Sequence, residues 1–187
     1  MSKFEWFNKN YFQDIIKVYM NSSVTVEPLK WSEVMKFLAL RQKVESETDN
    51  LALSGNERKS ERLWFSIGRL FANRKWLVNL IAKDGDEFVG YVSIFFAKSR
   101  KMRGNAYLVL GVRSNYRGKG IGTMLMKETD RMASSRGIRR LELEVFAKNT
   151  GAHKLFSRLG YEEEGRKRKA AETEDGFDDL ILMAKFI

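Results

Sequence analysis

The stretch from Leu108 to Leu125, LVLGVRSNYRGKGIGTML, decides the fold of this chain. Its first residues are apolar enough for a buried strand, and its last residues begin a helical pattern. Between them, the glycines at 118, 120 and 122 leave no Cβ over the turn, so backbone N–H groups can converge on an anion. The dipole of the following helix favours negative charge at the same place, and Arg117 and Lys119 add positive charge. A pyrophosphate is the ligand that this arrangement predicts.

The spacing of these glycines distinguishes between classes of phosphate-binding turn. It is G-x-G-x-G, and therefore neither the dinucleotide pattern G-x-G-x-x-G nor the nucleoside-triphosphate pattern G-x-x-x-x-G-K-[ST]. A glycine-rich turn alone is weak evidence for a ligand. A tight connection from strand to helix with no ligand is the alternative.

Outward from this stretch, the apolar periodicity predicts helices and strands along most of the chain. On the N-terminal side we expect a strand, two helices and three strands, at Val24–Leu29, Trp31–Glu47, Glu57–Ala72, Trp76–Ala82, Phe88–Ala97 and Asn105–Val112. On the C-terminal side we expect a helix, a strand, a helix and two strands, at Gly120–Arg136, Ile138–Phe146, Ala152–Leu159, Tyr161–Ala171 and Asp179–Phe186. This order predicts an α/β (α+β) protein with a mixed, mostly antiparallel central sheet flanked by helices.

Nothing in the sequence marks a boundary inside the main domain. The only proline is Pro28, and there is no repeat or low-complexity linker. We therefore predict a single domain over residues 22–187. Residues 1–21 have apolar residues at spacings of three and four and are predicted to form an N-terminal helical extension. It would pack on the main core or on a second subunit, which leaves a homodimer open.

The amino-acid composition limits the kinds of site that this protein can contain and the cellular location that we expect for it. The chain has no cysteine and one histidine, His153, so disulfides, thiolate sites and multi-histidine metal sites are excluded, and no metal is expected. No apolar run approaches the ~20 residues that cross a bilayer, and the start lacks a secretion signal. We therefore expect a cytoplasmic protein with no membrane partner.

The net charge of +10 would attract any polyanion. Part of the excess lies in two runs, Lys98–Arg103 and Arg166–Lys169, which we expect to be a solvated strand end or hairpin tip. No aromatic-plus-basic recognition motif appears, so nucleic acid is not an expected partner.

Three motifs resemble one family. YRGKGIGTMLM, from Tyr116, resembles the acetyl-CoA signature R/Q-x-x-G-x-G/A of the GNAT superfamily of N-acetyltransferases. LELEVFAKNTGAHKLFSRLGYEEEG, from Leu141, and DGFDDLILMAKFI, at the end, are similar to the family's later segments. The resemblance covers Val24 to Ile187. It implies a GNAT-like acyl-CoA N-acyltransferase fold that transfers an acetyl group from its co-substrate acetyl-CoA to a primary amine of a small molecule or protein.

The resemblance also assigns roles to residues. Backbone groups of Leu110 and Val112 would pair with the pantetheine arm. Asn149 would bond the amide-bearing arm, although a helix N-cap explains this residue equally well and the two roles can coexist. The thioester end would be lined by Ala152 and Phe156. The pyrophosphate would be held by the segment that comprises Arg117, Gly118, Lys119, Gly120, Ile121, Gly122 and Thr123.

Two positions depart from the family pattern, and at both of them many relatives have a side chain that accepts or donates a proton. Tyr107 stands where many relatives have a glutamate that takes the proton of the amine. Phe156 stands where many have a tyrosine that can protonate the leaving thiolate. Tyr107 and Glu144 are the candidate catalytic residues, Tyr107 as a relay through water and Glu144 as a base. A surface role is the better interpretation for His153, and no serine or threonine has an identifiable base, so direct attack in a ternary complex is expected.

The acceptor amine has no readable motif. It would be selected by Trp31–Asn73 and by the last hairpin, whose acidic residues are explained equally well by a solvated turn. The alternative function is a non-catalytic module on the same fold that binds CoA or, through its basic surface, nucleic acid.

Overall fold

The computed structural model describes residues 23–48, 76–173 and 176–187. The predicted extension at residues 1–21 and the predicted helix at Glu57–Ala72 lie outside the described residues. The division into an extension and a single domain at 22–187 therefore stays a prediction. In the described part of the chain, no helix is both long enough and apolar enough to cross a membrane.

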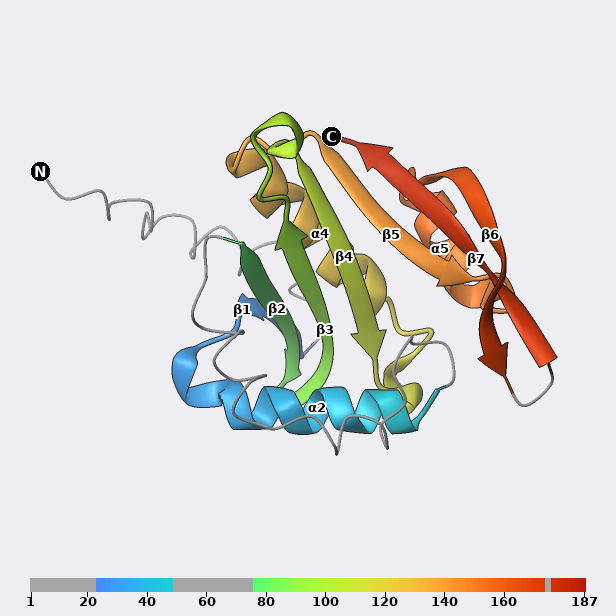
Figure 1. Cartoon of the computed structure of the whole chain (residues 1–187). Coiled ribbons are helices and arrows are strands. Elements are labelled where there is room, and N and C mark those ends of the chain that lie inside the picture. Colours follow the sequence, from blue (N-terminus) through green and yellow to red (C-terminus); the bar gives the residue numbers. More distant parts are fainter. Residues whose placement is uncertain (1–22, 49–75, 174–175) are drawn as a thin grey trace, which may run out of the picture.

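A seven-stranded mixed sheet forms the centre of the molecule (Figure 1), in the order β1-β2-β3-β4-β5-β7-β6. Every neighbouring pair is antiparallel except β4 and β5, which are parallel. The predicted fold class is confirmed. The strands are β1 Val24–Pro28, β2 Leu77–Asp84, β3 Glu87–Phe96, β4 Asn105–Val112, β5 Arg140–Phe146, β6 Glu162–Thr173 and β7 Gly176–Phe186.

Helices cover both faces of this sheet. On one face lies α2, Val34–Ser46, which follows a short 3-10 turn at Trp31–Glu33 and packs through Phe37 on Tyr91 of β3, with ring centroids 5.5 Å apart. The other face is covered by α4, Ile121–Ser135, and α5, Thr150–Arg158. Their apolar side chains belong to a separate and larger core cluster.

The helix and strand periodicities predicted the core well. The helical spacing places Ile121, Leu125 and Met132 of α4 on one face, and all three are buried; Gly137 follows the helix with a φ of +71°. In β5 the apolar residues at 141, 143 and 145 are buried, whereas Glu142 alternates with them. The Arg166–Lys169 run is exposed, but it lies inside β6 and not at a hairpin tip.

One glycine of β4 brings the sheet and the α2 core into close contact. A Cβ on Gly111 would lie 2.5 Å from Cε1 of Tyr91, which is fully buried. No side chain fits there without moving the ring, and this accounts for a glycine near the end of a central strand. The ring of Tyr91 therefore packs directly on the backbone of the strand that leads to the glycine-rich turn.

Candidate active site

The strands β4 and β5 pair only at their start. Asn105–Tyr107 are in register with Arg140–Glu142. Both strands continue, β4 to Val112 and β5 to Phe146, without further pairing between them in the described part of the chain. In Figure 1 the two ribbons diverge from this point. The hydrogen-bonding edge of β4 is therefore open along the second half of the strand.

The backbone groups of Leu110 and Val112 point into this opening. At the two ends of the β3–β4 ladder, Ala97 N–H donates to the Asn105 carbonyl and Arg113 N–H donates to the Val89 carbonyl, each over 3.0 Å. Residues alternate in an antiparallel ladder, so the odd-numbered residues of β4 bond to β3 and the even-numbered ones face β5. An open edge of this kind can pair with another extended chain, as the predicted pantetheine contact requires.

The start of α4 presents free N–H donors beside that edge. Gly118 and Gly120 have φ values of +75° and +83°, which favour glycine. The N–H of Met124 donates to the Gly120 carbonyl over 3.0 Å and makes the first intrahelical bond. The N–H groups of residues 121, 122 and 123 precede it and have no acceptor within the helix. Three donors at the positive end of a helix dipole suit an anion.

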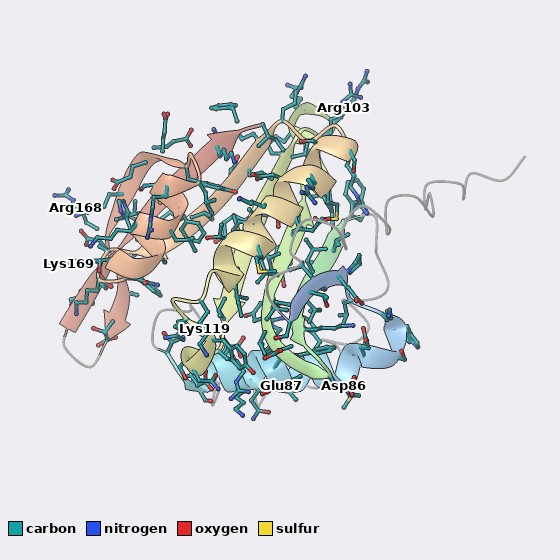
Figure 2. The ribbon with its side chains drawn as sticks, turned by 180° about the vertical axis from the view of Figure 1, so that it is seen from behind. Asp86, Glu87, Arg103, Lys119, Arg168 and Lys169 are labelled. Atoms are coloured by element: carbon teal, nitrogen blue, oxygen red, sulfur yellow. The ribbon has the colours of Figure 1, made fainter. Side chains whose placement is uncertain are left out.

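Gly122 allows β4, α4 and α5 to meet at this point. A Cβ there would lie 2.9 Å from Cδ2 of Leu155 and 3.6 Å from Cδ2 of Leu110. Two exposed cations stand at the rim of the turn. Arg117 donates from Nε to the Val112 carbonyl over 3.1 Å, and Lys119, labelled in Figure 2, holds Nζ 5.0 Å from the centroid of the Tyr116 ring.

Three carboxylates hold the segment that leads into this turn, and sequence reasoning missed them. Oε2 of Glu47, at the end of α2, accepts a bond from the Ser114 N–H over 2.6 Å. Asp84 and Glu87, beside the β2–β3 turn, each place an oxygen 3.2 Å from the Tyr116 hydroxyl. Glu47 and Glu87 also pair with Arg113. We call Glu47, Asp84 and Glu87 the loop anchor. Its members lie far apart in sequence from the segment that they hold, so no local pattern reveals them.

The charge state of Glu47 suits this role. Burial alone would raise the pKa of its carboxyl, but the bonds from Ser114 and the charge of Arg113 outweigh burial, and the net pKa is below the ordinary value of 4.5. Glu47 is therefore ionised at neutral pH and accepts the hydrogen bonds from Ser114 and Arg113.

Helix α5 supplies the other predicted cofactor residues. Asn149 caps the helix, because its Oδ1 accepts a bond from the Ala152 N–H over 3.1 Å. This bond leaves the two Nδ2 hydrogens to donate elsewhere. Phe156 is buried, and its ring centroid lies 5.8 Å from that of Tyr161. Ala152 is partly buried against the same core cluster.

The two candidate proton-handling residues belong to neighbouring strands. Tyr107 lies next to Glu142 in register, and Glu144 is two residues further along β5. Burial, together with the negative charge of Glu144, raises the pKa of Tyr107 to about 12. Tyr107 therefore keeps its proton at neutral pH. The carboxylate of Glu144 is held 2.6 Å from Nζ of Lys167 on β6.

His153 has a partner that the sequence did not reveal. Its Nε2 lies 2.5 Å from Oε1 of Glu163, and both side chains are partly exposed. The expected surface role fits this position on α5. Among the described residues, no group of three or more His, Cys, Asp or Glu side chains is arranged to hold a metal ion.

The model of the acetyltransferase (GNAT) family matches this chain over residues 41–161. Among curated proteins, the uncharacterized N-acetyltransferase YycN of Bacillus subtilis is 34% identical over 88 residues, which are 47% of this chain and 54% of YycN. The L-amino acid N-acetyltransferase AaaT of Escherichia coli is 27% identical over 127 residues, 67% of this chain and 76% of AaaT. The chain thus spans about half of YycN and about three quarters of AaaT.

Solved structures agree with the family match. The acetyltransferase of the GNAT family from Streptococcus pneumoniae has a TM-score of 0.78 and 27% identity, and the match covers 88% of this chain and 99% of that one. The ribosomal-protein-S18-alanine N-acetyltransferase from Escherichia coli has a TM-score of 0.68 over 88% of this chain and 94% of its own, and at 22% identity it shows the fold alone. The family match spans the strands β2 to β5, both helices of the α4 face and the glycine-rich turn, and this chain therefore belongs to the acetyltransferase (GNAT) family.

Proposed function

We propose that this protein transfers an acetyl group from acetyl-CoA to a primary amine, by direct attack in a ternary complex. One observation carries the proposal: three free N–H donors at the start of α4 lie beside the open edge of β4. The first feature suits a pyrophosphate and the second suits an extended arm with amide groups. Acetyl-CoA has both, and the family match points to the same co-substrate.

Each part of acetyl-CoA contacts a different group of residues. The amides of the segment from Arg117 to Thr123 hold the pyrophosphate, with Lys119 at the rim. The edge groups of Leu110 and Val112 pair with the pantetheine arm, and Nδ2 of Asn149 donates to it. Ala152 and Phe156 face the thioester end.

Acetyl transfer needs a neutral amine, and a primary amine of pKa about 10.4 is neutral only about once in 2,500 molecules at pH 7. The amine nitrogen attacks the thioester carbonyl carbon, the C–S bond breaks, and the thiolate leaves and takes a proton. Glu144 receives the proton that the amine loses, by way of water and the Tyr107 hydroxyl, which gives up one proton as it accepts another, and water returns a proton to the thiolate. Amides near Val112 polarise the carbonyl, and the fixed geometry supplies much of the rate.

The names of the relatives suggest which amines to try. They specify an L-amino acid for AaaT, an alanine of ribosomal protein bS18 for an Escherichia coli enzyme that is 35% identical over 75 residues, and L-2,4-diaminobutyric acid for an enzyme of Shouchella clausii. We propose an acceptor amine on an amino acid or at the start of a protein chain. A cytoplasmic location and a homodimer stay predictions from the sequence.

Steady-state kinetics tests the mechanism. Free-thiol release from acetyl-CoA, measured with amino acids, peptides that begin with alanine, diaminobutyrate and polyamines, first identifies an acceptor. Initial-rate lines at several fixed concentrations of that acceptor are then expected to intersect, because both substrates must be bound before transfer. Parallel lines, together with a gain of one acetyl group in the mass of the protein after acetyl-CoA alone, would show an acetyl-enzyme and contradict direct attack.

The second candidate function is a CoA-binding module without catalysis. Two observations favour it, the neutral Tyr107 in place of a glutamate and Phe156 in place of a tyrosine. The same measurements separate the two functions. Stabilisation by acetyl-CoA without thiol release from any amine in the panel would support the binding module.

The variant Phe156→Tyr tests the position that departs from the family pattern. We expect turnover to stay level or to rise by up to about tenfold, because the new hydroxyl can protonate the leaving thiolate. Tyr161→Phe is the matched control, since it changes one hydroxyl on the ring packed against Phe156, and its turnover should stay level. A large loss of turnover in Phe156→Tyr with acetyl-CoA binding preserved would show that Phe156 shapes the pocket instead.

A further inference from the structure

A group of exposed cations lies at the end of the molecule opposite the start of α4. Lys98, Arg100, Lys101 and Arg103 belong to the connection between β3 and β4, and Arg139 precedes β5. We call these five residues the distal basic end. In Figure 2, Arg103 and Lys119 lie at opposite ends of the molecule. The 15 residues of α4 separate the two ends by about 22 Å, at about 1.5 Å per residue.

The fold fixes these cations on one surface. The N–H groups of Arg139 and Arg140 both donate to the Gly104 carbonyl, over 2.8 and 3.1 Å. Nε of Arg139 lies 3.3 Å from the place where a Cβ on Gly104 would be. The connection between β3 and β4 includes a 3-10 turn at Arg100–Met102, closed by a bond from the Met102 N–H to the Ser99 carbonyl. Two segments far apart in the sequence therefore share one basic surface.

Within the described part of the chain, the distal basic end has no ion-pair partner. None of its five cations forms an ion pair with any residue that the structure describes. The carboxylates on the adjoining elements already have other cations. Glu128 pairs with Arg131 at 3.3 Å, Asp130 with Lys185 at 2.7 Å, and Glu142 with Arg140 at 2.7 Å.

The second basic run of the sequence differs in this respect. Arg166 lies 3.5 Å from Asp179, and Lys167 lies 2.6 Å from Glu144. Lys169 holds Nζ 5.7 Å from the centroid of the Phe177 ring. Half of that run is therefore neutralised within the fold, whereas the Lys98–Arg103 run forms no ion pair with any described residue, although both look alike in the sequence.

We propose that the distal basic end binds the phosphate chain of a nucleic acid. Three of its five cations are arginines, whose planar forks match phosphate oxygens in two-bond geometry. A membrane-binding surface would combine basic residues with an apolar face. The exposed turn from Lys98 to Arg103 offers only Met102, and the exposed ring of Phe186, near Arg139, lies 5.3 Å from the guanidinium carbon of Arg140. The absence of a recognition motif led us to expect no nucleic-acid partner. Phosphate contacts need no such motif, because they carry no sequence information.

Charge-matched variants test this proposal. The test variant carries Lys98→Gln, Arg100→Gln, Lys101→Gln and Arg103→Gln. The control variant loses the same charge elsewhere, through Lys36→Gln, Lys43→Gln, Lys127→Gln and Lys154→Gln, which are exposed positions without an ion pair to any described residue. Both changes reduce the net charge from +10 by four. Binding of a fluorescent poly(U) RNA of about 20 nucleotides is measured by anisotropy from about 50 to 200 mM salt.

We expect the test variant to bind the RNA at least about tenfold more weakly at low salt, with a salt slope lower by about 3, since each phosphate contact to a single strand contributes about 0.7. The control variant should stay within about threefold of the wild type. Saturating acetyl-CoA should not displace the RNA, because the proposed cofactor site is at the other end of α4. Thermal stabilisation by acetyl-CoA should be equal in all three proteins, whatever their affinity for RNA.

Three results would overturn the proposal. Equal losses in the test and control variants would show a general effect of net charge. Displacement of the RNA by acetyl-CoA would place the RNA at the start of α4. Binding of the wild type to vesicles rich in phosphatidylserine, without salt-sensitive binding to the RNA, would assign the surface to a membrane.

Discussion

Replacing Gly120 with valine is expected to abolish the stabilisation that acetyl-CoA gives to the folded protein. Gly120 has a φ of +83°, and placing a residue with a Cβ in this backbone conformation costs roughly 1–2 kcal/mol of stability. The turn can relieve this strain only by changing its path, which moves the donors of residues 121–123. A ligand at 100 times its Kd stabilises the folded state by about 2.7 kcal/mol. A loss of affinity of about 100-fold or more would remove most of the corresponding rise in Tm.

Gly137→Val is the matched control. Gly137 has a φ of +71° at the other end of α4, and a Cβ would meet nothing within 4 Å at either glycine. The two variants should therefore lose similar stability without ligand, but only Gly120→Val should lose the response to acetyl-CoA. A normal rise in Tm in Gly120→Val would remove this turn from the cofactor site.

Glu47→Gln is expected to raise the KM for acetyl-CoA by about tenfold and to change kcat by less than about twofold. Glutamine keeps the size of the side chain but loses the charge that holds Arg113 and strengthens the bond from Ser114. Hydrogen bonds to charged groups contribute about 1.5–3 kcal/mol. Partial exposure reduces that value, and about 1.4 kcal/mol corresponds to tenfold. The effect should fall on KM, since Glu47 positions the loop and touches no reacting atom.

Glu33→Gln is the control, because Glu33 lies near the other end of α2, pairs with Lys83 at 2.8 Å, and also has a lowered pKa. It should cost stability but leave the KM for acetyl-CoA unchanged. Since the folded pKa of Glu47 is lowered, its contribution to stability is present above its unfolded pKa and is lost as the pH falls through the folded value. The difference in Tm between wild type and Glu47→Gln should therefore shrink in acid. An equal KM effect in both variants would contradict the role of the loop anchor.

The fold could be predicted from the sequence because its elements carry strong local patterns. Local patterns determine where each element lies to within a few residues. Examples are the alternation in β5, the spacing of Ile121, Leu125 and Met132 in α4, and Gly137 after that helix. The glycine-rich turn likewise indicated a tight connection from strand to helix, which the structure builds with positive φ at 118 and 120. These features depend on neighbours in the chain, and periodicity captures them.

The contacts between distant segments could not be predicted in the same way. The bond from Ser114 to Glu47 joins residues 67 positions apart, and the bonds from Tyr116 join it to the β2–β3 turn. The pairing of Glu144 with Lys167 depends on the register of β5, β7 and β6, which no single segment determines. The two basic runs look alike in the sequence, and only the fold shows which one is neutralised.

The central claim is that acetyl-CoA lies between the start of α4 and the open edge of β4. A titration of isotopically labelled protein with acetyl-CoA, followed by the backbone amide NMR spectrum, tests it most directly. The largest shifts are predicted for the N–H groups of Leu110, Val112, Ile121, Gly122 and Thr123, because each would gain a hydrogen-bond partner or a phosphate neighbour. Gly137 and the distal basic end should not shift. Large shifts confined to the distal basic end or to β6, with the start of α4 unchanged, would contradict the account.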